Sequence, residues 1–360
     1  MKTRLLDWLV CPTCADGSLA LEAWRESTGE IEEGLLTCGS CARTYPIING
    51  IPRMLPDALR HLTVAYHADF FEQHRDRLKA VPAQDRPERD GWWRAESHTL
   101  RSYSYQWRKF KQMFPEWEQV FLDSIAPVTR EFFPGKVGLD GGCGFGRSLF
   151  YSATYGAEMI GLDLSEAIEA ARENTRRFEK VHLVQGDIFH PPVRRASLDF
   201  VYSIGVLHHL PDPKGGFLSL QRLVKPGCPV FIWVYLRGRG RQIAAFTAMR
   251  AISTRIPLRL LNVVTLGLAA AHWLLWIAPF KALTRVGATG LANRIPFALY
   301  AKYPFRALHT DWFDGMAVPL QRYYRREEVA EWYREAGHER VRIDEDWNGR
   351  AIGYVPQVRT

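Results

Sequence analysis

The second half of the chain alternates short apolar runs with polar segments of helical spacing. Five runs rich in β-branched and other apolar residues are bounded by glycine, aspartate or proline. They predict strands at residues 137–139, 157–162, 181–184, 198–204 and 230–235. The segments between them show helical spacing, as in Leu149, Phe150 and Tyr155 after the first run. Strands that alternate with helices indicate an α/β fold whose sheet is mainly parallel.

The C-terminal tail continues this pattern after an interruption. Residues 326–337 carry an amphipathic helix pattern that stops at Gly337, and residues 341–343 and 352–355 predict a closing pair of strands. Residues 237–310 separate the fifth strand from this tail. We predict that they are a helical insertion that forms a lid over the substrate side of one Rossmann-like domain.

The turn after the first strand points to a particular ligand. A dinucleotide-binding fingerprint would need a glycine where Arg147 stands. Instead, Asp140 is followed by glycines at every second position, Gly142, Gly144 and Gly146. Glycines let a ligand approach the backbone, amides at a helix start favour a carboxylate, and the acid suits an ammonium group. A carboxylate and an ammonium group together form the amino-acid end of S-adenosylmethionine.

Two further acids follow the next two predicted strands. Asp163 can accept hydrogen bonds from ribose hydroxyls, and Asp187 beside Ile188 can hold the amino group and face of an adenine. Acids after three strands in this order resemble the motif series of class I S-adenosylmethionine-dependent methyltransferases, nearest to the ubiquinone/menaquinone-biosynthesis type. The resemblance covers residues 136–236 and the C-terminal tail. The predicted cofactor-binding set is completed by Leu164, Ser203 and Tyr105.

Two groups of side chains are candidates for contact with substrate or cofactor. His208 and His209 follow the fourth strand, and either can act as a catalytic base toward a phenol, enol or amine. The alternative is that their turn only shapes the loop. Tyr105 and Trp107 lie in an aromatic stretch, where they either face the cofactor pocket or only pack in the core. We also expect residues 309–314 to line the substrate side.

The N-terminal residues predict a separate small unit. Two C-x-x-C pairs, Cys11 with Cys14 and Cys38 with Cys41, can present four thiolates to one tetrahedral zinc ion. A full set of thiolates indicates a structural rather than a catalytic metal. A redox pair or unliganded cysteines are the alternatives. The flanking sequence resembles the zinc-ribbon activator subunit of tRNA and protein methyltransferases.

Charge is distributed unevenly along the chain. Its formal net charge is +8, yet residues 237–306 hold nine arginines, two lysines and no acid, which leaves −3 for the remainder. Residues 260–280 within this segment are uncharged and long enough to cross a bilayer. Both ends of the insertion return to one sheet, which argues against a single crossing. We therefore expect either a plain lid or an interfacial contact with a membrane or a lipid-like, anionic substrate.

These patterns predict an S-adenosylmethionine-dependent methyltransferase acting on a small, rather apolar metabolite, such as a quinone-like, lipid-like or natural-product intermediate. One alternative is an RNA methyltransferase whose ribbon and basic insertion bind phosphates, and another is a non-catalytic cofactor-binding scaffold. Cysteine usage and an opening without a secretory leader predict a cytoplasmic protein, with peripheral contact at the inner membrane face as a variant. The predicted units are a zinc ribbon at 1–56, a helical connecting region at 57–135, the methyltransferase domain at 136–236 and 311–360, and the insertion at 237–310.

Overall fold

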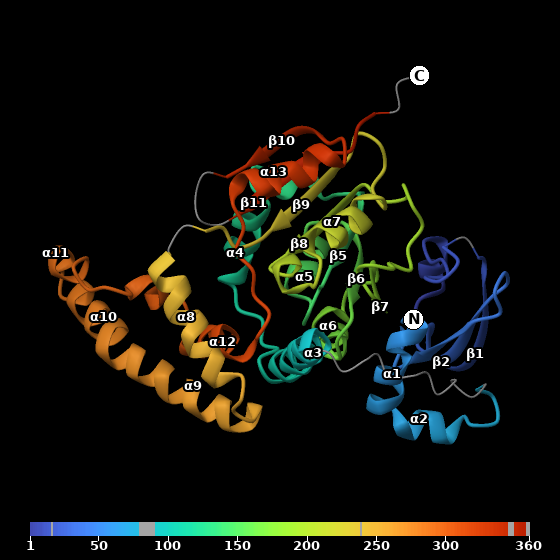
Figure 1. Cartoon of the computed structure of the whole chain (residues 1–360), viewed down its shortest axis with the longest axis horizontal. Coiled ribbons are helices and arrows are strands. Elements are labelled where there is room, and N and C mark those ends of the chain that lie inside the picture. Colours follow the sequence, from blue (N-terminus) through green and yellow to red (C-terminus); the bar gives the residue numbers. More distant parts are fainter. Residues whose placement is uncertain (16, 79–90, 238–239, 345–348, 358–360) are drawn as a thin grey trace.

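The computed structural model describes residues 1–15, 17–78, 91–237, 240–344 and 349–357. The chain begins with a short helix, η1 (Thr3–Asp7), and a four-stranded antiparallel sheet. The strands of this sheet are β1 (Leu19–Ser27), β2 (Glu30–Cys38), β3 (Thr44–Ile48) and β4 (Ile51–Pro52), paired in that order. This N-terminal unit lies at one end of the molecule (Figure 1).

A seven-stranded sheet forms the centre of the molecule (Figure 1). Its strands lie in the order β10-β11-β9-β8-β5-β6-β7, and the five from β5 to β9 run parallel. β11 pairs antiparallel with both β9 and β10. The bounds are β5 (Val137–Gly141), β6 (Glu158–Asp163), β7 (Val181–Gln185), β8 (Phe200–Ile204), β9 (Pro229–Trp233), β10 (Glu339–Ile343) and β11 (Arg350–Tyr354). The predicted α/β class is confirmed.

Helices connect the strands and cover the sheet. They are α5 (Arg147–Thr154), α6 (Ala167–Thr175), α7 (Pro213–Gln221) and α13 (Arg326–Glu335). From β5 the chain moves outward through β6 to β7, and then returns to the other side of β5 for β8 and β9. Such a reversal of strand order opens a crevice at the carboxyl ends of the central strands, where open α/β sheets bind ligands.

The start of β8 and the end of α13 lie close to the boundaries that the sequence predicts. The fourth strand was expected from residue 198, but β8 begins at Phe200, because Leu198 makes only an isolated bridge with Val224. The helix expected to stop at Gly337 is α13, and Gly337 has a φ of +75°, in the left-handed region that ends a helix.

Between the N-terminal unit and the sheet, the chain forms helices that reach the carboxyl edge of the sheet. They are η2 (Asp57–Leu59), α1 (Arg60–Tyr66), α2 (Ala68–Gln73), α3 (Gly91–Lys109), α4 (Trp117–Ile125) and η3 (Arg130–Phe132). α3 packs against α6, which belongs to the sheet domain. Glu166, which precedes α6, donates its amide to the hydroxyl of Ser104 in α3 at 3.3 Å.

The insertion after β9 is helical, as predicted. It contains α8 (Gly240–Ser253), α9 (Leu258–His272), η5 (Trp273–Ile277), α10 (Ala278–Arg285), α11 (Thr289–Ala292), η6 (Ala298–Lys302) and α12 (Phe305–Ala317). α9, η5 and α10 form one long arm that projects away from the sheet (Figure 1). α12 packs against α8 and α9 and also against α3, so the predicted boundary at residue 310 lies inside a helix that contacts both parts.

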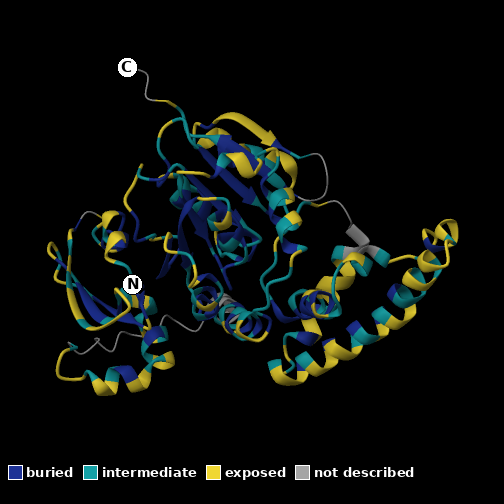
Figure 2. Cartoon of the chain, turned by 180° about the vertical axis from the view of Figure 1, so that it is seen from behind, coloured by how far each residue is buried: buried dark blue, intermediate teal, exposed yellow. Residues whose placement is uncertain are grey.

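The N-terminal unit is joined to the central sheet by backbone pairing and a shared core. Leu9 forms an isolated bridge with Val193, and Arg53 forms one with Gln185 at the end of β7. Side chains of Leu9 and Val193 belong to the same buried cluster, together with Trp8 from the N-terminal unit. Figure 2 shows buried residues on both sides of this contact. The two units therefore form one continuous body.

Candidate active site

The glycine-rich turn after β5 depends on glycines in the left-handed region. Gly142 (φ +87°) and Gly146 (φ +83°) adopt conformations that other residues rarely reach. A Cβ atom at Gly142 would lie 2.5 Å from Cγ1 of Val206, and one at Gly146 would lie 3.1 Å from Cα of Ala171 in α6. The two glycines therefore let the turn pack against its neighbours. Gly144, between them, lines the cavity described next.

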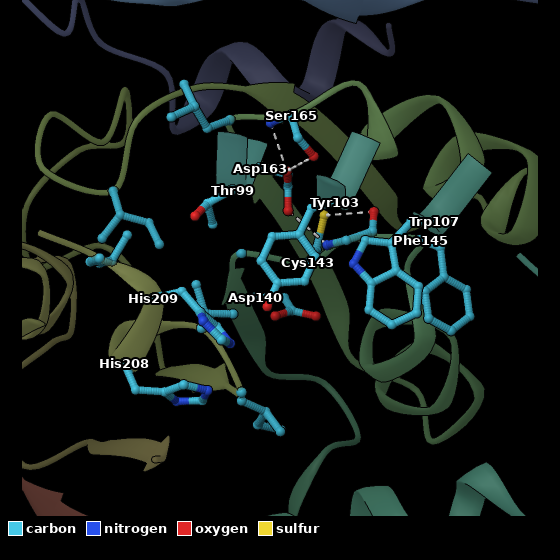
Figure 3. A pocket seen from close by; sticks show the side chains of 18 of the residues that line it. Thr99, Tyr103, Trp107, Asp140, Cys143, Phe145, Asp163, Ser165, His208 and His209 are labelled. Atoms are coloured by element: carbon cyan, nitrogen blue, oxygen red, sulfur yellow. Dashed lines mark hydrogen bonds between the residues drawn. The ribbon is translucent and has the colours of Figure 1, made fainter. Parts of the chain in front are cut away.

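A cavity of about 290 Å³ opens at the carboxyl ends of the central strands (Figure 3). Its lining contains nine of the predicted site residues: Asp140, Gly142, Gly144, Asp163, Leu164, Asp187, Ile188, His208 and His209. Gly146 and Ser203 lie behind it. Gly146 packs on α6, and the Ser203 hydroxyl donates to the carbonyl of Gly141 at 2.7 Å. These two residues support the shape of the turn from outside the cavity.

Asp163 ties the turn to the end of β6. One carboxylate oxygen accepts the amide of Gly144 at 2.8 Å, and the other accepts the amide and hydroxyl of Ser165 at 2.8 and 2.7 Å. Burial raises the pKa of this carboxyl, and the same hydrogen bonds counteract part of that rise. A carboxylate has about four acceptor sites, so these bonds leave capacity for a ligand hydroxyl in the cavity.

Asp187 holds a fixed position at the neighbouring strand end. Its oxygens accept the amide of Phe189 at 3.0 Å and pair with Nδ1 of His190 at 2.8 Å. The hydrogen bond to Asp187 raises the pKa of His190. Ile188 beside it also lines the cavity. An acid and an apolar side chain thus stand together at the place predicted for an adenine.

α3 presents two aromatic rings to the cavity. Tyr103 and Trp107 are one helical turn apart, and their rings stack at 6.3 Å with planes 8° apart. Trp107 also stacks on Phe145 of the glycine-rich turn, at 4.8 Å. Tyr105 lies on another side of α3, where its ring contacts Phe313 at 5.6 Å, and it is not among the residues of the lining. The tyrosine that α3 presents to the cavity is therefore Tyr103, where the sequence had suggested Tyr105.

The two predicted histidines lie in η4 (Leu207–His209), are buried and line the cavity. Nδ1 of His209 donates to the carbonyl of Leu320 at 2.5 Å, which leaves Nε2 as an acceptor. Burial lowers the pKa of His209 to about 4, so its ring is neutral near pH 7. Nδ1 of His208 has no hydrogen-bond partner among the described residues, and its ring lies 4.5 Å from that of Tyr235.

Acids from α12 complete the cavity. Within the segment expected on the substrate side, Asp311 and Asp314 belong to the lining, where Asp314 accepts a hydrogen bond from Gln106 at 2.9 Å. Tyr300 donates its hydroxyl to Asp311. Burial raises the pKa of Asp311 to about 6. Arg147 also lines the cavity, although the sequence had marked it only as a departure from the dinucleotide fingerprint.

The four cysteines of the N-terminal unit converge on one point. Their sulfur atoms all lie within 4.8 Å of one another, with Cys11 and Cys41 at 3.6 Å and Cys14 and Cys38 at 3.5 Å. Zinc–sulfur bonds of about 2.3 Å in a tetrahedron place the sulfurs roughly 3.8 Å apart. A Cβ atom on Gly17 would lie 2.3 Å from Sγ of Cys38. The four thiolates therefore fit a tetrahedral structural zinc ion.

Comparison with known families agrees with both sites. Residues 139–232 match the family described as methyltransferase domain, and residues 2–50 match the family described as Trm112p-like protein. The chain carries a class I S-adenosylmethionine-dependent methyltransferase domain behind a Trm112-like zinc ribbon. The predicted fold, cofactor and structural zinc are thereby confirmed.

Relatives of the methyltransferase domain act on different acceptors. A ubiquinone biosynthesis O-methyltransferase of Thiobacillus denitrificans is 33% identical over 144 residues, 38% of this chain and 58% of that protein. Phosphoethanolamine N-methyltransferase 2 of Caenorhabditis elegans is 31% identical over 120 residues, 32% of this chain and 28% of that protein. The chain spans less than two thirds of the length of these curated relatives. The relatives therefore leave the acceptor of this protein undetermined.

The chain is also similar to a solved structure. It is the complex of the Haloferax volcanii Trm112 methyltransferase activator with a methyltransferase. The match has 16% identity and a TM-score of 0.42, and it covers 73% of this chain and 98% of that chain.

Proposed function

We propose that the protein transfers the methyl group of S-adenosylmethionine to a small, rather apolar acceptor. The observation that carries this proposal is the cavity in which Asp140, Asp163 and Asp187, from three neighbouring strand ends, surround the glycine-rich turn. Asp140 and the turn amides suit the amino-acid end of the cofactor, Asp163 the ribose, and Asp187 with Ile188 the adenine. When bound, the cofactor supplies a methyl group activated by its sulfonium sulfur.

The remaining wall of the cavity supports an apolar acceptor of the quinone-like, lipid-like or natural-product type. Tyr103, Trp233 and Tyr235 line it, and the rings of Trp233 and Tyr235 lie 4.9 Å apart. Aromatic walls with a few polar groups favour flat, apolar ligands, which gain affinity by leaving water. Arg147 is the one lysine or arginine among the described lining residues, so the cavity itself offers little to an acceptor that carries several phosphates.

His209 is the residue that we propose as the catalytic base. Its Nδ1 proton is committed to Leu320, and the neutral ring keeps Nε2 able to accept the proton of an acceptor hydroxyl. Its contact with Tyr103, edge to face at 5.3 Å, orients the ring against α3. His208 packs against it, with the two rings 4.1 Å apart.

Calorimetric titration with S-adenosylmethionine tests the cofactor site. Asp163→Ala removes the carboxylate that holds Gly144 and Ser165 and faces the ribose. Loss of hydrogen bonds to a charged acceptor costs about 1.5–3 kcal/mol, so affinity should fall by roughly ten- to a hundredfold. The control is Asp123→Ala, on the exposed side of α4, which should bind as the wild type does. A wild-type protein that binds no S-adenosylmethionine would overturn the proposal.

Transfer of a labelled methyl group separates the remaining alternatives. Acceptors should include quinols and other phenols, lipid extracts and tRNA, and mass spectrometry of co-purifying small molecules should guide the choice. Transfer to a phenol or quinol is the expected result. Transfer to tRNA alone, with binding that weakens steeply as salt rises, would favour an RNA methyltransferase. Cofactor binding without transfer to any acceptor would favour a scaffold protein.

A further inference from the structure

The arm of the insertion, Leu258–Arg285, has one packed face and one exposed face. Buried residues of α9 recur at helical spacing, with Leu261, Thr265 and Ala269 on the side that packs on α12. Figure 2 shows exposed positions on the arm. In α9 and η5 these include six apolar residues: Leu260, Val263, Val264, Leu266, Leu274 and Leu275. We call this set the apolar face.

The apolar face is unusual for a helix that borders water. Surface helices normally place charged and polar residues on the side away from the core. Here the residues from 260 to 280 include no charge, and Leu274 and Leu275 are 68% and 63% exposed. A large contiguous apolar patch on a protein surface marks an interaction site. The apolar face therefore suits contact with a partner.

Charge identifies the chemistry of that partner. Arg255 and Arg259 stand before the apolar face, Lys281 and Arg285 stand after it, and all four are exposed. The surrounding residues 237–306 contain no acid that could neutralise them. A second copy of the same face would bring these like charges together, which disfavours self-association. An apolar strip between clusters of cations complements a lipid surface that carries anionic headgroups.

We propose that the arm docks along the surface of a membrane that contains anionic lipids, such as the cytoplasmic leaflet. Among the described residues, the arm is the one helical stretch long and apolar enough to cross a bilayer. Crossing is incompatible with the fold, because β9 before the insertion and β11 after it are paired in one sheet. The packed side also carries polar groups, with Thr265 bonded to His309 and His272 to the carbonyl of Phe297. In this arrangement lipid contacts the apolar face, and the packed side with its polar groups stays against the protein.

Docking has a consequence for the acceptor, and this consequence rests on the proposed methyltransferase function. α12 packs on the arm and contributes Asp311 and Asp314 to the cavity. The arm and α12 thus connect the membrane surface to the substrate side of the cavity, and docking holds the enzyme at a phase that concentrates apolar acceptors. Docking itself does not depend on turnover, so vesicle binding and methyl transfer can fail separately.

Co-sedimentation of the whole protein with vesicles tests the proposal. The vesicles contain phosphatidylcholine alone or phosphatidylcholine mixed with phosphatidylglycerol, at low and high salt. We expect binding to the mixed vesicles at low salt, weaker binding to the neutral ones, and release at high salt. Hydrogen–deuterium exchange should show added protection in the arm when mixed vesicles are present. Absence of binding at low salt, or retention after alkaline carbonate extraction, would overturn surface docking.

Two sets of substitutions assign the binding to the arm. The apolar set should reduce binding at least tenfold: Val263→Ser, Leu274→Ser and Leu275→Ser. The charge set should reduce binding by roughly a hundredfold, since each basic residue near the surface contributes about fivefold: Arg255→Gln, Arg259→Gln and Arg285→Gln. Both sets replace exposed residues, so circular dichroism should show an unchanged fold.

Control variants carry substitutions of the same kinds outside the arm. The apolar control replaces two exposed residues of other elements, Tyr66→Ser and Val341→Ser. The charge control removes three exposed cations from the rest of the chain, Arg108→Gln, Arg176→Gln and Lys180→Gln. Controls that bind as the wild type does, beside arm variants that do not, support the proposal. Equal loss in the arm and control variants, or self-association of the wild type through the arm in sedimentation velocity, would contradict it.

Discussion

At the scale of single residues, His209 illustrates how burial sets chemical state. The ring is buried, and a charged imidazolium there would lose the water that stabilises it. The hydrogen bond from Nδ1 to the carbonyl of Leu320 offsets part of this loss, and the net effect is a pKa of about 4. The same burial that makes His209 a neutral base also makes the folded protein sensitive to acid.

The pH dependence of stability should reveal this residue. Because the unfolded chain binds a proton near pH 6.5 and the folded protein only near pH 4, stability falls as pH drops through that window. At about pH 5, His209 should cost about 2 kcal/mol relative to neutral pH. His209→Gln keeps a donor for Leu320 and lacks this titration. Urea unfolding at both pH values should therefore show a smaller acid loss in the variant.

Other buried histidines, such as His208, lower stability at acid pH in both proteins, so the difference between them isolates His209. An identical pH dependence in the wild type and in His209→Gln would show that His209 titrates normally. Methyl transfer measured on the same variant then reports on the proposed base independently of stability.

Some site residues could be predicted from the sequence, and others could not. Asp163 and Asp187 could be located because each ends an apolar run, and parallel strands bring such ends to one edge. The choice between Tyr103 and Tyr105 depends on which side of α3 faces the cavity. The sequence does not specify this side, because aromatic residues occur on several sides of the helix. Arg147 was missed because its position in the turn suggested only the absence of a glycine.

At the scale of elements, the zinc ribbon shows how a small unit is stabilised. β1 contributes no buried residue, and the buried residues of β2 and β3 pack into the core shared with the central sheet. The four cysteines add a link between the segment before β1 and the turn after β2. Binding energy of a structural zinc ion in such a unit is folding energy. The C-x-x-C spacing was enough to predict these ligands, but the need for Gly17 beside Cys38 appears only in three dimensions.

Gly17→Ala should weaken zinc binding without removing a ligand. The added Cβ atom would lie 2.3 Å from Sγ of Cys38, so either the sulfur or the backbone must shift. We expect faster zinc release to a chelator and a lower melting temperature than in the wild type. Gly290→Ala is the control, because a Cβ atom there has no neighbour within 4 Å. Elemental analysis that finds no zinc in the wild type, or equal release rates, would contradict the assignment.

At the scale of the whole molecule, the ribbon and the cofactor site share one polar network. Arg53, at the end of the ribbon, is 2% exposed and donates to Gln185 at 3.2 Å. Gln185 in turn donates to the carbonyl of Leu164, beside Asp163, at 3.1 Å. The sequence indicated two separate units, and it could not show this contact because its partners are more than a hundred residues apart.

The junction between the ribbon and the sheet domain depends on the charge of Arg53. Arg53 neutralises Glu169 and lies 3.7 Å from the nearly buried carboxylate of Glu166. Arg53→Met keeps much of the apolar volume but leaves both carboxylates without that cation, which should lower the free energy of unfolding by about 3–5 kcal/mol. Cofactor affinity should fall as well. Gln185 would lose its hydrogen bond from Arg53, and this bond fixes the side chain that donates to the carbonyl of Leu164.

A compensating variant distinguishes loss of the charge pair from loss of packing. Adding Glu166→Gln and Glu169→Gln to Arg53→Met removes the unpaired charges, so most of the stability should return while the link to Gln185 stays broken. Urea unfolding and calorimetric titration with S-adenosylmethionine measure the two effects separately. If the single variant is as stable as the wild type, or the triple variant recovers nothing, the ion pairs do not hold the ribbon in place. If stability returns and affinity does not, the ribbon supports the cofactor site through Gln185.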